Sequence, residues 1–113
     1  MKYLVSFFSI LLFISCSYGV SFQIHNNTNS KIDSVKISGG SSIVFYDIKP
    51  NKTVNKFMDF RNTRSMNDGA FTVEIFKKDQ VRRQNFGYIS NGIPQNSSFM
   101  LEIKKDTVKI KTQ

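Results

Sequence analysis

Along most of the chain after residue 19, apolar and polar side chains alternate with a period of two. This period places successive side chains on opposite faces of an extended chain, so it predicts β-strands that are buried on one face. No window sustains the i, i+3, i+4 spacing of an amphipathic helix over three turns. Strands are predicted at about 20–25, 32–37, 43–48, 53–60, 71–76, 81–88, 99–104 and 108–111. The 43–48 run is mostly apolar and predicts burial on both faces.

Turn residues separate these segments at intervals of about 8–12 residues. They include a hairpin-type loop at 39–42, a polar loop at 61–69, a tight turn at Lys78-Asp79 and a loop at 91–94. This spacing is typical of an all-β sandwich or barrel. We therefore predict a single small sandwich of about eight short antiparallel strands, immunoglobulin-like in the broad sense.

One turn carries a more specific prediction. The stretch from Ile48 to Val54 resembles the apolar-x-Pro-Gly corner of immunoglobulin-like sandwiches, with Pro50 followed by Asn51 where that corner has glycine. Asn51 suits the position because asparagine also accepts the left-handed conformation. The resemblance implies that a strand ends here and that the chain crosses to the facing sheet.

The first residues have the composition of a secretion signal. Met1 and Lys2 form a short positive segment, and residues 3–14 are apolar except for Ser6 and Ser9. Such a run lies within the roughly 7–15 residues of a signal's apolar core and is short of the roughly 20 that span a bilayer. We predict that residues 1–19 are a signal peptide and that residues 20–113 form the sandwich domain.

Two cleavage positions remain open for this signal. Phe13-Ile14-Ser15-Cys16 resembles the lipobox of bacterial lipoproteins, although that family prefers leucine where this chain has Phe13. The resemblance implies that the Cys16 thiol receives a diacylglyceryl group and that Cys16 becomes the first residue. Alternatively, signal peptidase cuts after Gly19, because Ser17 and Gly19 supply the small residues of an A-x-A-like site.

The cleavage position decides where the protein resides. Several acyl chains anchor a protein stably, since each buried methylene contributes about 0.8 kcal/mol. Ser17 follows Cys16, and in the Gram-negative lipoproteins that this stretch resembles, a residue other than aspartate there implies the outer membrane. We predict an exported protein, held in the outer membrane or periplasm as a lipoprotein and otherwise secreted.

Over its whole length the chain is similar to small uncharacterised lipoproteins of Gram-negative bacteria. The resemblance implies no activity. The features that carry it are the signal with Cys16, the opening from Asn27-Thr28-Asn29 to Ile37, Asp68-Gly69 before a strand, and Phe86-Gly87-Tyr88 followed by Asn91-Gly92.

The chain is basic, with a formal net charge of +8. Lys2 contributes one of these charges, so the part after the signal carries +7. Such a domain is attracted to phosphate, anionic polysaccharide and acidic lipid. Cys16 is the single cysteine, so no internal disulfide can form, and a domain of roughly 95 residues can build a core without one.

Basic residues concentrate on one predicted hairpin. Lys77 and Lys78 end its first strand, and Arg82 and Arg83 lie in its second, with the Lys104-Lys105 pair as a further candidate. Beside an envelope surface these side chains would contact anionic lipid or polysaccharide. Each would contribute on the order of 1 kcal/mol to the binding free energy. The alternative is edge protection, because lysines on exposed strands discourage aggregation between sheets.

Patterns of catalysis or metal binding are missing from the sequence. His25 is the single histidine, and no two acidic residues lie within three positions of each other. Structural metal sites need such ligands clustered, and a catalytic triad needs a placed nucleophile and base. We predict no enzyme activity, no metal and no cofactor. An exported location also argues against nucleic acid as a partner.

These observations favour a non-catalytic binding or structural module of the cell envelope, tethered to the membrane through a lipidated Cys16. The rival hypothesis is a soluble secreted inhibitor or effector. It would bind a partner protein of unknown identity through an edge strand or through the 61–69 loop.

Overall fold

The computed structural model describes residues 19–60, 69–90, 93–94 and 96–112. The signal as far as residue 18, with Cys16, lies outside the described residues, as do residues 61–68 of the predicted 61–69 loop. Within the described part no helix is long and apolar enough to cross a membrane. The strands are β1 (Gly19–Asn26), β2 (Ile32–Gly39), β3 (Ser41–Ile48), β4 (Thr53–Asp59), β5 (Gly69–Lys77), β6 (Gln80–Ser90), β7 (Ile93–Pro94), β8 (Ser98–Ile103) and β9 (Val108–Thr112).

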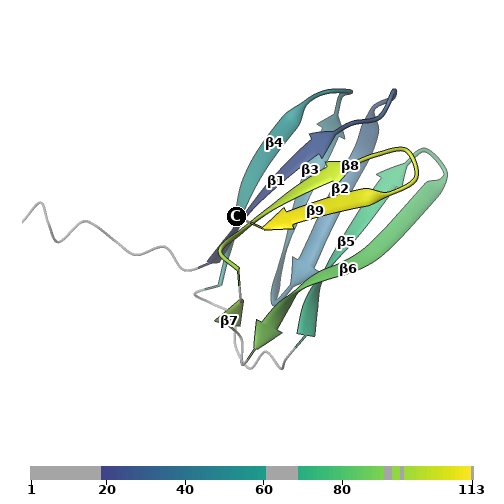
Figure 1. The fold of residues 1–113 in the computed structure, drawn as a ribbon. Helices are drawn as coiled ribbons and strands as arrows, with labels where there is room; N and C mark the ends of the chain where they lie inside the picture. The colour runs from purple at the N-terminus through teal and green to yellow at the C-terminus, as the bar shows by residue number, and fades with distance from the viewer. Residues whose placement is uncertain (1–18, 61–68, 91–92, 95, 113) are drawn as a thin grey trace, which may run out of the picture.

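The strands form two sheets that face each other, which confirms the predicted all-β sandwich. One sheet has the order β4-β1-β8-β9 and the other the order β3-β2-β5-β6-β7. Figure 1 shows the two layers, with the yellow β9 at one side of the first sheet. Every pairing is antiparallel except that of β1 with β8, which run parallel. The parallel pair joins strands from opposite ends of the chain.

The core lies between the sheets and follows the alternation in the sequence. Each sheet turns one set of alternate side chains inward, and these side chains are almost fully buried. The first sheet contributes Phe22, Ile24, Phe99 and Leu101, and the second contributes Val35, Ile37, Phe71, Val73, Ile75 and Phe86. The period-two pattern therefore predicted the inward face correctly.

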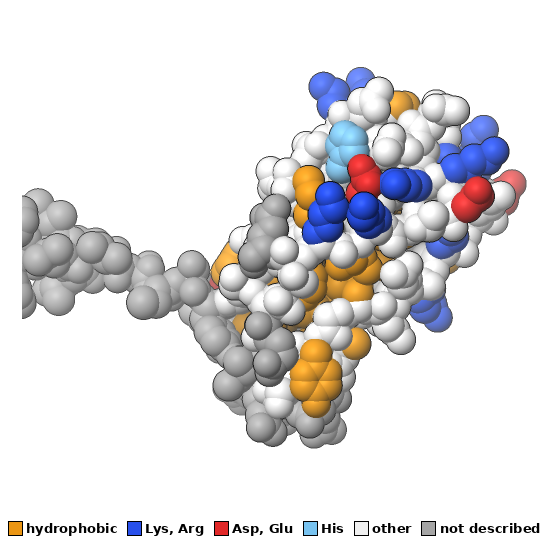
Figure 2. All heavy atoms as spheres, in the orientation of Figure 1, with side chains coloured by type: hydrophobic (Ala, Val, Ile, Leu, Met, Phe, Trp, Pro, Cys, Tyr) orange, Lys and Arg blue, Asp and Glu red, His pale blue; other side chains and the backbone are white. Residues whose placement is uncertain are grey.

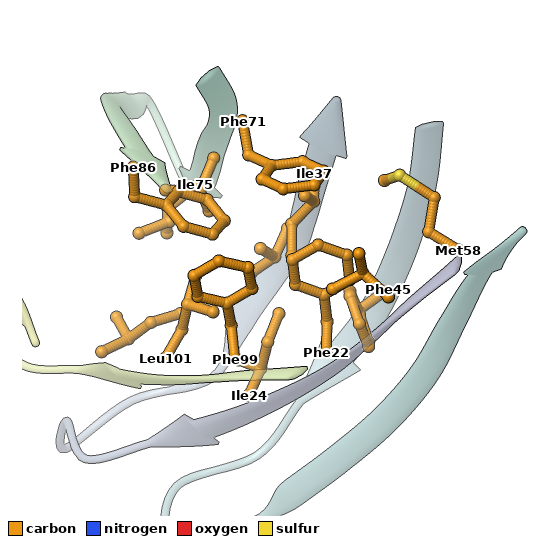
Figure 3. Close-up of a cluster of buried hydrophobic side chains, with 14 of the residues drawn as sticks. Phe22, Ile24, Ile37, Phe45, Met58, Phe71, Ile75, Phe86, Phe99 and Leu101 are labelled. Atoms are coloured by element: carbon orange, nitrogen blue, oxygen red, sulfur yellow. The ribbon is translucent and has the colours of Figure 1, made fainter. Parts of the chain in front are cut away.

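Phenylalanine rings fill the centre of this core. Phe22 and Phe99 from one sheet stack at 5.8 Å between centroids, and both meet the ring of Phe71 edge-on. Phe86 completes the group at 5.1 Å from Phe99. Figure 3 shows these rings meeting from the two layers. Aromatic pairs in these geometries add about 0.5–1.5 kcal/mol each beyond the burial of their area.

β3 differs from its prediction. The apolar run 43–48 predicts burial on both faces, but Tyr46 is 69% exposed and Val44 is only half-buried. β3 is the edge strand of its sheet, and its outer face is covered by nothing among the described residues.

The corner after β3 forms as its sequence predicts. Lys49 to Lys52 make a turn in which the Lys52 N–H donates to the Lys49 carbonyl at 3.1 Å. Asn51 adopts φ 63°, the left-handed conformation expected of it. β3 belongs to one sheet and β4 to the other, so the chain crosses between the layers at this turn.

Candidate functional site

Four connections carrying lysines meet at one end of the sandwich. They are the β1–β2 loop and the β3–β4, β5–β6 and β8–β9 turns. Strand direction reverses at each of these connections, and β8 runs parallel to β1, so all four fall at the same end. We call this the lysine-rich end. Its lysines are Lys31, Lys49, Lys52, Lys77, Lys78, Lys104 and Lys105.

Hydrogen bonds between the connections fix this arrangement. The Asn51 N–H donates to the Asn26 carbonyl at 2.7 Å, and the Asn27 N–H donates to the Ile103 carbonyl at 2.8 Å. Arg82 Nη2 donates to the Lys104 carbonyl at 2.9 Å. These bonds tie both sheets together beside the lysines, so the lysine-rich end is a defined surface.

Asn26 is the centre of this network. It is fully buried, and its side-chain Nδ2 donates to the carbonyls of Ile48 at 2.8 Å and Ser30 at 3.0 Å. Its Oδ1 accepts from the Thr28 N–H at 3.0 Å and from the Thr28 hydroxyl at 2.6 Å. One buried amide therefore holds the β1–β2 loop against the end of β3, and all its hydrogen-bonding groups are used.

The β5–β6 turn is held in a strained conformation. Lys78 has φ 52°, which costs a residue with a β-carbon roughly 1–2 kcal/mol. Its N–H donates to Asp33 Oδ2 at 2.7 Å, a bond between the turn and the start of β2. The predicted tight turn is confirmed, and its lysines occupy fixed positions beside the β1–β2 loop.

Most lysines at this end carry no counter-charge. Lys31 lies 3.2 Å from Asp47, and Lys104 Nζ lies 3.6 Å from Glu102. Among the described residues the side chains of Lys49, Lys52, Lys77, Lys78 and Lys105 make no ion pair. Lys77 and Lys105 line the same two shallow hollows, one between their turns and one beside the β1–β2 loop.

The structure separates the four predicted basic residues into three environments. Lys77 and Lys78 lie in the lysine-rich end. Arg83 lies on the outer face of its sheet, where its Nη2 is 2.8 Å from Glu74 Oε2. Arg82, the residue before it in β6, turns to the opposite side and bonds the β8–β9 turn. Alternation along a strand explains why neighbouring arginines point to opposite faces of their sheet.

Lys105 lies beside Lys77, since both line the same two hollows, and Lys104 precedes it in the β8–β9 turn. Lys31, Lys49 and Lys52 were not predicted to belong with them. The signal that could have identified them is connectivity, because in a chain of reversing strands every second connection returns to the same end. That inference requires the number and direction of the strands to be known.

The lysine-rich end lies opposite the point where the described chain begins. Gly19 pairs with Asp59 at the far end of β1, whereas Asn26 lies among the four connections. The seven steps between Gly19 and Asn26 span about 23 Å. Figure 2 shows Lys and Arg side chains gathered on the half of the molecule that carries these turns. Any N-terminal attachment therefore leaves the lysines at the remote end.

The metal-ligating side chains of the described residues are scattered over the molecule. No three His, Cys, Asp or Glu side chains lie close enough together to hold a metal ion in that part of the chain. His25 Nδ1 is 2.8 Å from the Thr53 hydroxyl on the exposed face of β1 and β4. No described acidic side chain bonds this histidine.

Comparison with known proteins supports the fold alone. The chain is similar to a protein from Eubacterium rectale solved by NMR, with a TM-score of 0.56 and 11% sequence identity. The match covers 83% of this chain and 87% of that one. No protein-family model matches the chain, and no curated protein does either. At this identity the likeness concerns the arrangement of strands.

Proposed function

We propose that this protein is a non-catalytic binding module of the cell envelope, anchored by a lipid on Cys16, whose lysine-rich end binds an anionic polymer. The observation that carries the proposal is the gathering of unpaired lysines from separate connections at one end. Clustered cations raise the local concentration of a polyanion, and each adds favourable energy when no acid neutralises it. The anchor rests on the lipobox-like segment and is a separate part of the proposal.

The position of Gly19 favours a polymer over the headgroups of the anchoring membrane. Two residues separate Cys16 from Gly19, and the three steps between them reach at most about 11 Å. With Gly19 near the membrane, the lysine-rich end points away from it by about 23 Å. The Debye length is about 8 Å at physiological ionic strength, so the headgroups attract these lysines weakly. An anionic polysaccharide beyond the membrane is in reach.

Metabolic labelling with a palmitate analogue tests the anchor. We expect label on the wild-type protein and none on a Cys16→Ser variant. Absence of label from the wild type, or label that persists in the variant, would contradict the anchor. The protein would then be secreted after cleavage behind Gly19, and the lysine-rich end could still bind its ligand.

Titration with dextran sulfate tests the lysine-rich end of the purified protein. We expect binding that weakens with salt, and neutral dextran should not bind. The double substitution Lys77→Gln and Lys105→Gln should weaken binding at least about tenfold, since each basic residue contributes on the order of 1 kcal/mol. The matched control is Lys109→Gln with Lys111→Gln, which removes the same charge from β9.

Equal losses in both double variants would show that binding follows net charge and would refute the assignment to this end. Vesicles of phosphatidylglycerol provide the other arm of the experiment. If they bind the wild type more tightly than dextran sulfate does, the ligand is an acidic headgroup rather than a polymer.

A further inference from the structure

β6 is the longest strand, with 11 residues, and one of its edges is open. β5 pairs with one edge of β6 along most of its length. β7 pairs with the other edge, but only at Ile89 and Ser90. Among the described residues no strand pairs with that edge from Val81 to Tyr88. Open edges of this length are places where another chain can add a strand.

The register of the hairpin shows which backbone groups are available. Lys77 and Gln80 flank the two-residue turn and form its closing pair. A two-residue hairpin closes on a hydrogen-bonded pair, and bonded pairs then alternate along the ladder. The N–H and C=O groups of Val81, Arg83 and Asn85 therefore point away from β5, toward the open edge.

A groove runs beside this edge, between β6 and the β8–β9 hairpin. Its lining includes Ile75, Arg82 and Gln84 on one side and Thr107 and Val108 on the other. Val108 and its neighbour on the same face, Ile110, are only partly buried although they pack against the core. Figure 2 shows hydrophobic side chains exposed on the face of the molecule that carries β9. The groove thus combines an apolar wall with an unpaired strand.

The opposite side of the sandwich differs, because a lysine there blocks the addition of a strand. There the edge strands β3 and β4 are bridged by Lys56, whose Nζ donates to the Val44 carbonyl at 2.6 Å. The same Nζ lies 5.6 Å from the centroid of the Phe45 ring. An inward lysine of this kind blocks the addition of a strand. Arg82 crosses the open side only at its end, where it bonds Lys104.

We propose that this groove binds an extended acidic segment of a partner protein, which pairs with β6 as an additional strand. Charge selects the occupant, because the basic residues exceed the acidic ones. Arg82 and Arg83 border the groove and Lys105 lies beside it, whereas the acids are Asp106 in its lining and Glu74, which pairs with Arg83. An added strand turns alternate residues into the gap between the sheets and outward. Apolar residues of the segment turn inward and contact Val108 and Ile110, and acidic residues turn outward on the face that carries Arg83.

This inference rests on the fold and on the open edge, and it does not depend on the polyanion site. The probe is a capped seven-residue peptide that alternates glutamate with valine, titrated into the ¹⁵N-labelled protein. We expect amide exchange with solvent to slow at Val81, Arg83 and Asn85, whose N–H groups gain acceptors. Arg82 and Gln84 should change little, because β5 already bonds their amides.

Substitutions of neighbouring residues separate the groove from general charge. Gln84→Glu places a negative charge in the groove, and Asn85→Asp places the same charge one residue later on the outer face. We expect the first to weaken binding of the peptide about tenfold more than the second, because Gln84→Glu places its charge against the inward valines, whereas Asn85→Asp leaves it in solvent. Asn85→Pro removes an outward N–H and should weaken binding about tenfold relative to Asn85→Ser, which keeps it.

Three outcomes would overturn the proposal. One is that a peptide alternating lysine with valine binds as tightly, which removes the charge selection. Another is that the acidic peptide binds without the alternating protection of β6. The third is that the amides of Arg83 and Asn85 are already protected from exchange in the protein without peptide, and that the mass in solution is twice that of one chain. This result would assign the edge to a second copy of this chain.

Discussion

Replacing Asn26 by alanine tests whether one buried amide holds the lysine-rich end together. The substitution removes the two bonds that Nδ2 donates and the two that Oδ1 accepts. The carbonyls of Ser30 and Ile48 and the N–H of Thr28 lose a partner. Ser30 and Thr28 are part-buried, so water can replace their bonds, whereas the bond to Ile48 is buried.

The expected cost follows from these four bonds. A typical hydrogen bond contributes a net of about 1 kcal/mol, and a buried group left without a partner costs about 1–3 kcal/mol. We count the Ile48 carbonyl as left without a partner, and the bonds of Ser30 and Thr28 as partly replaced by water. The free energy of unfolding should then fall by about 3 kcal/mol. A domain of this size has roughly 5–14 kcal/mol of stability in total, so the effect is large.

Urea unfolding followed by far-UV circular dichroism measures this cost, since the chain contains no tryptophan for fluorescence. With a slope of about 1–1.5 kcal/mol/M for a domain of this size, the midpoint should fall by about 2–3 M. Asn29→Ala is the matched control, because Asn29 is exposed and makes no hydrogen bond through its side chain. A shift for Asn26→Ala no larger than that of the control would refute the role of the amide.

Three further predictions concern the backbone and the edges. Gly87→Ala should lower stability by about 2 kcal/mol in urea unfolding, because Gly87 has φ 68° and its new β-carbon would lie 2.8 Å from the Phe99 ring; an unchanged midpoint would contradict this. Lys78→Gly should raise stability by up to about 1 kcal/mol by relieving the left-handed φ, and a loss would contradict it. Lys56→Val should promote self-association in sedimentation velocity, because it removes the bond to Val44 and opens that edge; a variant that stays monomeric at all concentrations would contradict it.

Much of the sandwich follows from local pattern. The alternation of Val20, Phe22 and Ile24 with polar neighbours determines both the strand and the face it buries, because the period of a strand is set by its own backbone. The same holds for Asn51, whose left-handed conformation depends on a choice available to few residue types. These features need no knowledge of distant segments.

The pairings could not be derived in this way. β1 pairs with β8 in parallel, and the residues that align, such as Phe22 with Phe99, lie far apart in sequence. Nothing in either segment specifies the other, since any strand with one apolar face suits the same position. The exposure of Tyr46 has the same origin, because the run around it is apolar while no described strand packs over the outer face of its sheet.

The candidate sites likewise combine features of single segments with features that only the fold creates. The sequence alone determined the secretion signal pattern, the single cysteine at position 16 and the basic character of the Lys77 and Lys105 turns. Only the tertiary structure decided that four connections meet at the end opposite Gly19, that Arg82 and Arg83 have partners on opposite faces of their sheet, and that β6 keeps an open edge among the described residues. The physical reason is that charge and periodicity are properties of a segment, whereas a surface is formed by segments that only folding brings together.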